Sequence, residues 1–79
     1  MQCIVRTQVH AFLGRQAHAS YHAIAGNGCR YHVHASRDRN GRAVHWWAGN
    51  HDATAPAGDR YRSAATLAEL DAILASLRA

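Results

Sequence analysis

Apolar and polar residues alternate along most of the first 48 positions of the chain. The alternation falls into four stretches, at residues 2–13, 17–25, 29–36 and 43–48. In the first stretch, Cys3, Val5, Thr7, Val9, Ala11 and Leu13 form the apolar side, and Gln2, Arg6, Gln8 and His10 form the polar side. A period of two is typical of antiparallel strands with one face buried and the other in solvent. The pattern therefore predicts four such strands.

The connections between these stretches predict how the strands pair, because residues opposite each other in a ladder share a face. Three-residue loops are expected at 14–16 and 26–28, and a two-residue type I′ turn at Asn40-Gly41. The resulting partners are Val9 with Tyr21, Tyr21 with Val33, and Val33 with Ala48. All of these pairs are apolar, which favours a four-stranded meander with the first and fourth strands at its edges.

The last part of the chain has a helical pattern. Residues 49–65 are expected to form a loop that contains the only proline and, at 60–62, a possible short extension of the sheet edge. Thr66 and Glu69 have the spacing of a capping box, which predicts a helix over 67–78. Its apolar stripe comprises Leu67, Leu70, Ile73, Leu74 and Leu77. We expect a single α+β domain over 1–79, with the sheet at 2–48 and a β-β-β-β-α order in two layers.

Covering one face of the sheet with this helix leaves the other face open to solvent. Cross-strand rows expected on that face are Gln8, His22 and His32; then His10, Ser20, His34 and Trp47; then Phe12, His18, Ser36 and His45; and finally Arg6, Ile24 and Arg30. The candidate partner-binding residues in these rows are Arg6, His10, His22, Arg30, His32, His34, His45 and Trp47. An exposed tryptophan among cationic groups suits a binding site, unless the loop at 49–65 folds back over it. Arg37, Arg39 and Arg42 add a basic hairpin tip that could reach phosphates or carboxylates.

Other chemistry has weaker support. His32 and His34, with His22 or His10 on a neighbouring strand, could hold a metal ion, but no acidic residue or cysteine lies in these rows. Cys3 and Cys29 are expected to be buried, inert thiols too far apart for a disulfide. No nucleophile-base set, carboxylate pair or phosphate-binding glycine loop is present. We therefore expect no enzymatic activity, no metal, no cofactor and no small-molecule substrate.

Composition indicates a class of partner. The chain has 79 residues, 48% of them hydrophobic, and a net charge of +4. All nine basic residues are arginine, which together with the abundant alanine reflects a GC-rich genome more than a function. The positive charge still favours an acidic partner, either nucleic acid or an acidic protein surface. No apolar run is long enough to span a membrane and no signal peptide is recognisable, so we expect a cytoplasmic location.

A small chain with a meander sheet, one helix and no catalytic set resembles the small phage-encoded anti-CRISPR proteins, in particular inhibitors of type I-C surveillance complexes. This resemblance covers the whole chain and rests on no diagnostic motif. It implies a protein of the bacterial host cytoplasm that binds Cas (Cascade) subunits and blocks target DNA binding. The alternatives are a small RNA- or DNA-binding domain that uses the same face, and, more remotely, a histidine-based metal-binding module.

Overall fold

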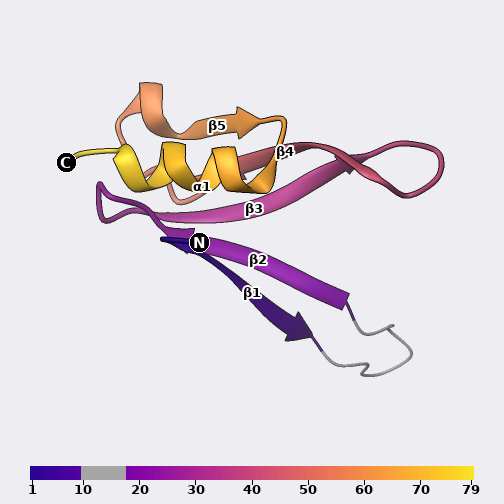
Figure 1. The fold of residues 1–79 in the computed structure, drawn as a ribbon. Coiled ribbons are helices and arrows are strands. Elements are labelled where there is room, and N and C mark those ends of the chain that lie inside the picture. Colours follow the sequence, from indigo (N-terminus) through magenta and orange to yellow (C-terminus); the bar gives the residue numbers. More distant parts are fainter. Residues whose placement is uncertain (10–17) are drawn as a thin grey trace.

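The computed structural model describes residues 1–9 and 18–79 of the chain. They form one antiparallel sheet, in the order β1-β2-β3-β4-β5, with helix α1 packed against it (Figure 1). The strands are β1 (Ile4–Val9), β2 (His18–Ile24), β3 (Arg30–Arg37), β4 (Ala43–Gly49) and β5 (Tyr61–Ala64), and the helix is α1 (Leu67–Ser76). The α+β class and the C-terminal helix are confirmed. The prediction of four strands is wrong, because the sheet has five.

The fifth strand lies in the segment that was expected to be mostly loop, and it bears out in part the edge extension expected at 60–62. Tyr61 pairs with Gly49, and Ala64 pairs with Trp46, so β5 rather than β4 forms this edge of the sheet. A 3₁₀ turn over Ala57–Asp59 precedes it. Strand β5 has only four residues, which is too short for a period of two to stand out in the sequence.

The register of β1 differs from the prediction. Val9 pairs with His18 instead of Tyr21, and Ile4 pairs with Ala23. Ile4 is therefore the buried residue, and Val5 is 52% exposed on the other face. The expected loop at 14–16 lies outside the described residues. The physical reason for the change lies in helix α1, where buried Asp71 accepts hydrogen bonds from the N–H groups at the start of β1.

The other two turns follow the predicted registers. Tyr21 pairs with Val33, and Val33 pairs with Ala48, as expected. The loop at 26–28 is a three-residue turn that has Gly28 in the left-handed region (φ +82°). The expected type I′ turn at 40–41 is wrong, because only its glycine, Gly41, has a positive φ (+80°). A bulge between Ser36 and Arg37 instead makes a three-residue loop at 39–41.

The core lies between α1 and the sheet. Leu70 and Leu74 are fully buried on the predicted stripe, and Leu77 is nearly so. They meet small sheet residues such as Ala23 and Ala48, whose short side chains let the helix approach closely. The N-cap is confirmed, because the Thr66 hydroxyl accepts a 3.2 Å hydrogen bond from the N–H of Glu69. The helix ends at Ser76, two residues before the predicted boundary. Among the described residues, no helix has the length and hydrophobicity needed to cross a membrane.

Candidate interaction face

The face of the sheet opposite α1 carries most of the histidines. We call it the open face, and we define it by the side chains that alternate away from the core. Its described members are Val5, Thr7, Ser20, His22, Ile24, Arg30, His32, His34, Ser36, His45, Trp47, Gly49, Tyr61 and Ser63. Helix α1 packs against the other face through β4 and β5. The open face is therefore the side of the sheet that can meet a partner.

Most of the predicted cross-strand neighbours are observed. His22 pairs with His32, and His34 pairs with Trp47. The structure also pairs Ser36 with His45, and Ile24 with Arg30, as expected. The alternation in the second, third and fourth strands was thus sufficient to place these side chains on one face.

The first strand does not contribute the residues that were expected. Arg6 pairs with Tyr21, whose ring packs edge-on against Trp46 on the core side, so Arg6 lies on the face opposite the histidines. The prediction that Arg6 lies in one cross-strand row with Ile24 and Arg30 is wrong, because the register of β1 is shifted. Val5 takes the position beside His22 that had been assigned to Gln8. His10 and Phe12 lie outside the described residues.

A chain of aromatic rings crosses the open face. The ring centroids of His34 and His32 lie 6.2 Å apart in a stacked arrangement. His32 is also 6.2 Å from His51, which in turn is 6.4 Å from Tyr61. Four rings from β3, the loop after β4, and β5 thus follow one another across the face, with the His32–His51 pair tilted by 48° and the His51–Tyr61 pair edge-on at 71°. His51 was not among the predicted site residues, because it follows the strand and no periodic pattern points to it.

Gly49 makes room for His51. An added Cβ at Gly49 would lie 3.0 Å from two atoms of the His51 ring, closer than side chains normally approach. The imidazole therefore lies over the backbone of β4, where any other residue would place its side chain. Because Gly49 has no side chain, the His51 ring can lie close to His32.

Asn50 holds the loop that carries His51. Its side chain is almost fully buried and donates hydrogen bonds to the carbonyl oxygen of Arg30 (2.9 Å) and to the hydroxyl of Thr54 (3.0 Å). The side-chain oxygen of Asn50, Oδ1, accepts a 2.9 Å hydrogen bond from the backbone N–H of Ala55. These bonds join the loop directly to β3, so His51 has a defined position relative to that strand. No periodic pattern or motif in the sequence points to this asparagine.

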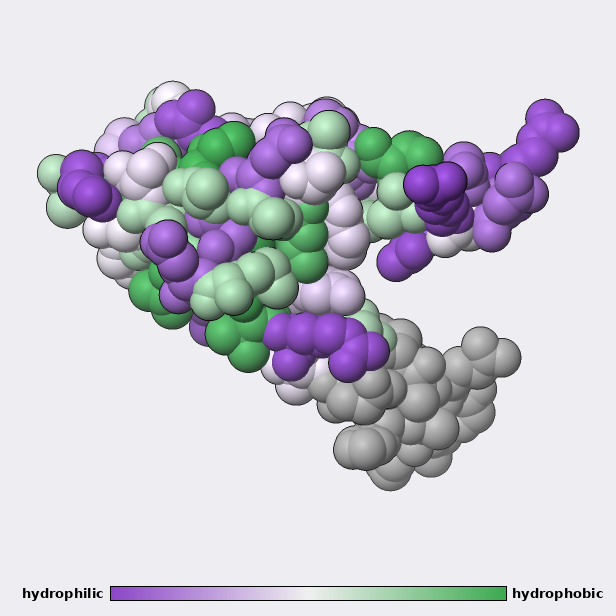
Figure 2. Space-filling model, viewed as in Figure 1, coloured by the Kyte–Doolittle hydropathy of each residue, from purple (hydrophilic) through white to green (hydrophobic). Residues whose placement is uncertain are grey.

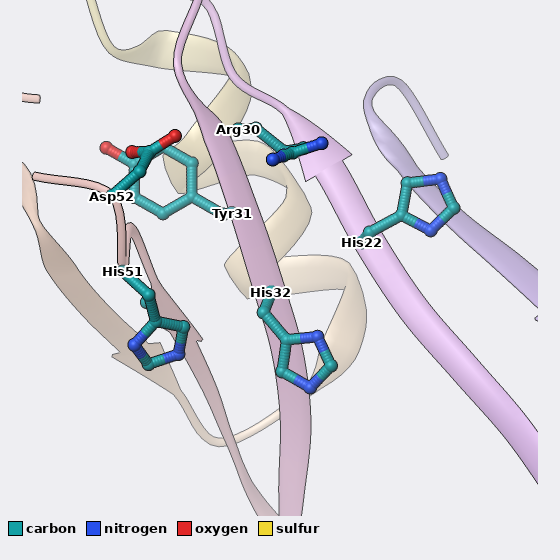
Figure 3. A pocket seen from close by; sticks show the side chains of 7 residues that line it. His22, Arg30, Tyr31, His32, His51 and Asp52 are labelled. Atoms are coloured by element: carbon teal, nitrogen blue, oxygen red, sulfur yellow. The ribbon is translucent and has the colours of Figure 1, made fainter. Parts of the chain in front are cut away.

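These residues surround an open pocket of about 500 Å³ (Figure 3). Its lining comprises His22, Arg30, Tyr31, His32, Gly49, His51 and Asp52. Tyr31 belongs to the core side of β3, where its ring is fully buried and its hydroxyl donates a 2.6 Å hydrogen bond to the carbonyl of Asp59. The pocket combines imidazoles, one guanidinium and one carboxylate.

Trp47 lies beside the pocket region and remains accessible. Its side chain is 42% exposed, so the segment at 49–65 does not fold back over it. The indole N–H donates a 2.8 Å hydrogen bond to the hydroxyl of Ser36, and the His45 ring lies 4.9 Å away. These contacts hold the indole in one orientation, and an oriented, exposed indole is well suited to contact a partner.

The β3–β4 hairpin ends in a basic tip. Arg37, Arg39 and Arg42 are all exposed there, and Figure 2 shows hydrophilic residues gathered along this projecting arm. The Arg37 guanidinium donates a 2.9 Å hydrogen bond to the carbonyl of Gly41. Asp38 has the turn-forming role expected for it, because its carboxylate accepts hydrogen bonds from the N–H groups of Asn40 and Arg42. The three guanidiniums can reach an acidic surface beyond the sheet.

The histidines considered as metal ligands and the two cysteines form neither a metal site nor a disulfide in the described part of the chain. Within residues 1–9 and 18–79, no group of three or more histidine, cysteine or acidic side chains is placed to hold a metal ion. Cys3 and Cys29 are free thiols and are only partly buried, which corrects the expectation of full burial. Burial and the neighbouring Asp71 carboxylate raise the pKa of Cys3 to about 11, so its thiol is protonated at neutral pH.

Comparison of the chain with protein-family models, with curated proteins and with solved structures found no match. The open face, its pocket and the basic hairpin tip are therefore the observations on which a function rests.

Proposed function

We propose that this chain is a non-enzymatic inhibitory protein that binds a macromolecular partner through the open face. The observation that carries the proposal is the exposed Trp47 beside the chain of rings, on the sheet face opposite α1. Tryptophan and arginine are the residues most often found at the energetic centre of protein interfaces. A rigid sheet that offers such a face needs no cofactor to bind.

The partner that we propose is a Cas surveillance complex of type I, most specifically type I-C, in the cytoplasm of a bacterial host. The resemblance to small anti-CRISPR proteins supplies this identity, and the charge of the chain is compatible with it. The net charge of +4 and the exposed Arg39 and Arg42 favour an acidic protein surface, or a site where protein and guide RNA meet. Binding there would prevent the complex from engaging target DNA.

The test is a target-binding assay with a purified type I-C complex and labelled double-stranded DNA. We expect the chain to co-purify with the complex and to reduce the fraction of DNA bound in a stoichiometric manner. Trp47→Ala and Arg30→Ala should each weaken inhibition by about tenfold or more, the usual effect of removing a central interface side chain. Arg6→Ala is the matched control, since Arg6 lies on the opposite face and its loss should leave inhibition intact.

Two results would contradict this proposal. Full inhibition by both Trp47→Ala and Arg30→Ala would exclude the open face as the contact surface. Failure to bind any type I complex, combined with a salt-sensitive gel shift on generic RNA or DNA, would instead support the nucleic-acid-binding alternative. Thermal unfolding of each variant, followed by circular dichroism, separates a lost contact from a lost fold.

A further inference from the structure

The pocket on the open face gathers four side chains that can carry positive charge. They are His22 on β2, Arg30 and His32 on β3, and His51 on the loop after β4. Figure 3 shows the three imidazole rings spread across the pocket, with the Arg30 guanidinium on the His22 side of β3 and Asp52 on the His51 side. Three separate segments of the chain thus contribute cationic groups to one space of about 500 Å³.

These four side chains are available to a ligand. In the described part of the chain, none of them makes a side-chain hydrogen bond or ion pair. Asp52 is different, because its carboxylate accepts hydrogen bonds from the hydroxyl (2.8 Å) and the N–H (3.2 Å) of Thr54. The carboxylate is therefore hydrogen-bonded within its own loop and interacts with Arg30 only through charge, while the described residues offer the neighbouring donors no hydrogen-bond acceptor.

The charge of the pocket depends on pH. Arg30 and Asp52 carry fixed charges of opposite sign, whereas imidazole is the side chain whose charge generally changes between pH 5 and pH 8. Hydrogen bonds from Thr54 lower the pKa of Asp52, so this carboxylate remains ionised over the whole range in which imidazoles titrate. Each imidazole that gains a proton between pH 8 and pH 5 adds one positive charge.

The neighbours of these imidazoles do not cancel that gain. Val5, opposite His22 on β1, carries no charge. His34, stacked on His32, adds a further imidazole, and Tyr61, next to His51 on β5, is a neutral phenol. Mild acidification therefore makes the pocket an increasingly strong site for an anion.

We propose that this pocket binds the phosphate group of a nucleotide, and that binding strengthens as the pH falls from 8 to 6. Phosphate offers several acceptor oxygens, which suits guanidinium and imidazole donors that arrive from different segments. A terminal phosphate loses part of its second negative charge near pH 6 but keeps its first, so it remains an anion while the pocket gains positive charge. The planar faces of His32 and His51 can stack with the base, as aromatic side chains do in single-strand binding.

This inference goes beyond the proposed function, because it requires neither a Cas complex nor inhibition. The minimal probe is uridine 5′-monophosphate, added to the full chain in a two-dimensional NMR titration of the imidazole protons at pH 6.0 and pH 8.0. We expect the signals of His22, His32 and His51 to shift at pH 6.0, and the affinity to be at least about tenfold weaker at pH 8.0. Uridine, which lacks the phosphate, is expected to produce little or no shift.

Substitutions of single residues test whether the phosphate binds in this pocket. Arg30→Gln and His51→Ala remove pocket donors at exposed positions, and each should weaken binding by about tenfold. His45→Ala is the matched control, because His45 is an imidazole on the same face but packs on Trp47 outside the pocket. Equal losses in the control and the pocket variants would overturn the pocket assignment. Equal binding of uridine and its monophosphate, or binding that does not change with pH, would overturn the phosphate or the imidazole part of the proposal, respectively.

A second pair of probes identifies the source of the phosphate. A short single-stranded RNA with a 5′-phosphate is compared with the same strand without it. Tighter binding of the phosphorylated strand than of both the unphosphorylated strand and the mononucleotide identifies a strand end as the ligand, whereas equal binding of the phosphorylated strand and the mononucleotide identifies a free nucleotide. Both results support a phosphate site, and failure of every phosphorylated probe at pH 6.0 would disprove it.

Discussion

The carboxylate of Asp71, in the last helix, accepts a 2.8 Å hydrogen bond from the backbone N–H of Ile4, at the start of the first strand. The same carboxylate accepts hydrogen bonds from the N–H groups of Gln2 (2.8 Å) and Cys3 (2.9 Å). Asp71 is only 4% exposed, so this contact joins the two ends of the described fold inside the protein. It also decides which face of β1 is buried, because it fixes the position of Ile4.

Asp71→Asn should destabilise the protein. An amide has one acceptor oxygen, whereas the carboxylate serves three N–H donors, and the new NH₂ group would face those donors. We expect a loss of about 2–4 kcal/mol in the free energy of unfolding, measured by urea denaturation at pH 7. Glu69→Gln, at an exposed position of the same helix, is the control and should change stability by less than about 0.5 kcal/mol. An Asp71→Asn variant as stable as the wild type would show that these hydrogen bonds do not hold β1.

The stabilisation by Asp71 should disappear in acid. Burial opposes ionisation of this carboxyl, but the N–H donors of Gln2, Cys3 and Ile4 outweigh it and lower the pKa to about 2. The folded state therefore binds this proton less readily than the unfolded state, whose carboxyl has the ordinary value of 3.8. The contribution is complete above about pH 4 and is lost as the pH falls towards 2. The stability difference between wild type and Asp71→Asn should shrink over that range, and a constant difference would contradict the assignment.

Cys3 should react slowly with alkylating agents. Because burial and Asp71 raise its pKa to about 11, only roughly one thiol in a thousand is ionised at pH 8, and the thiolate is the reactive form. Mass spectrometry after timed treatment with iodoacetamide measures the rate at this residue. The urea-unfolded protein is the control and should react far faster. Equal rates in the folded and unfolded states would contradict the proposed environment of the thiol.

Gly26→Ala should be strongly destabilising. An added Cβ would lie 2.3 Å from the carbonyl oxygen of Leu77 and 2.5 Å from that of Ala75, so backbone atoms would have to move. The N–H of Gly26 also donates a 2.9 Å hydrogen bond to the carbonyl of Leu74, near the end of α1. We expect a loss of about 2–3 kcal/mol by thermal or urea unfolding. Gly58→Ala is a matched control, because nothing lies within 4 Å of its added Cβ, and it should be nearly neutral.

Gly49→Ala should move the His51 ring without unfolding the protein. The new methyl group would meet the ring at 3.0 Å, and the ring belongs to an exposed side chain that can rotate away. Stability should change by less than about 1 kcal/mol. Nuclear Overhauser contacts between His51 and His32 should weaken, and the affinity for uridine 5′-monophosphate at pH 6.0 should fall. Unchanged contacts between the two rings would show that Gly49 is not what places His51.

The placement of the imidazoles on one face was predictable for the strands with an unambiguous alternation. In β3, Tyr31 and Val33 alternate with His32 and His34, so only one face can be buried. In β1, Ile4 and Val5 are neighbouring β-branched residues, and the alternation permits either to face the core. The choice depends on a contact with a helix more than sixty residues away, which no local pattern encodes. Arg6 was consequently assigned to the wrong face.

By itself, the sequence determined the α+β class, the pairing of β2 with β3 and of β3 with β4, and the start of the helix at Thr66. These features depend on short-range physics: alternation, turn residues and a cap act over a few neighbouring positions. The tertiary structure alone decided the face of β1, the full extent and pairing of the fifth strand, and the contact between His51 and His32. Those depend on Asp71, on the loop held by Asn50 and on the space above Gly49, which are contacts between segments that only the folded chain brings together.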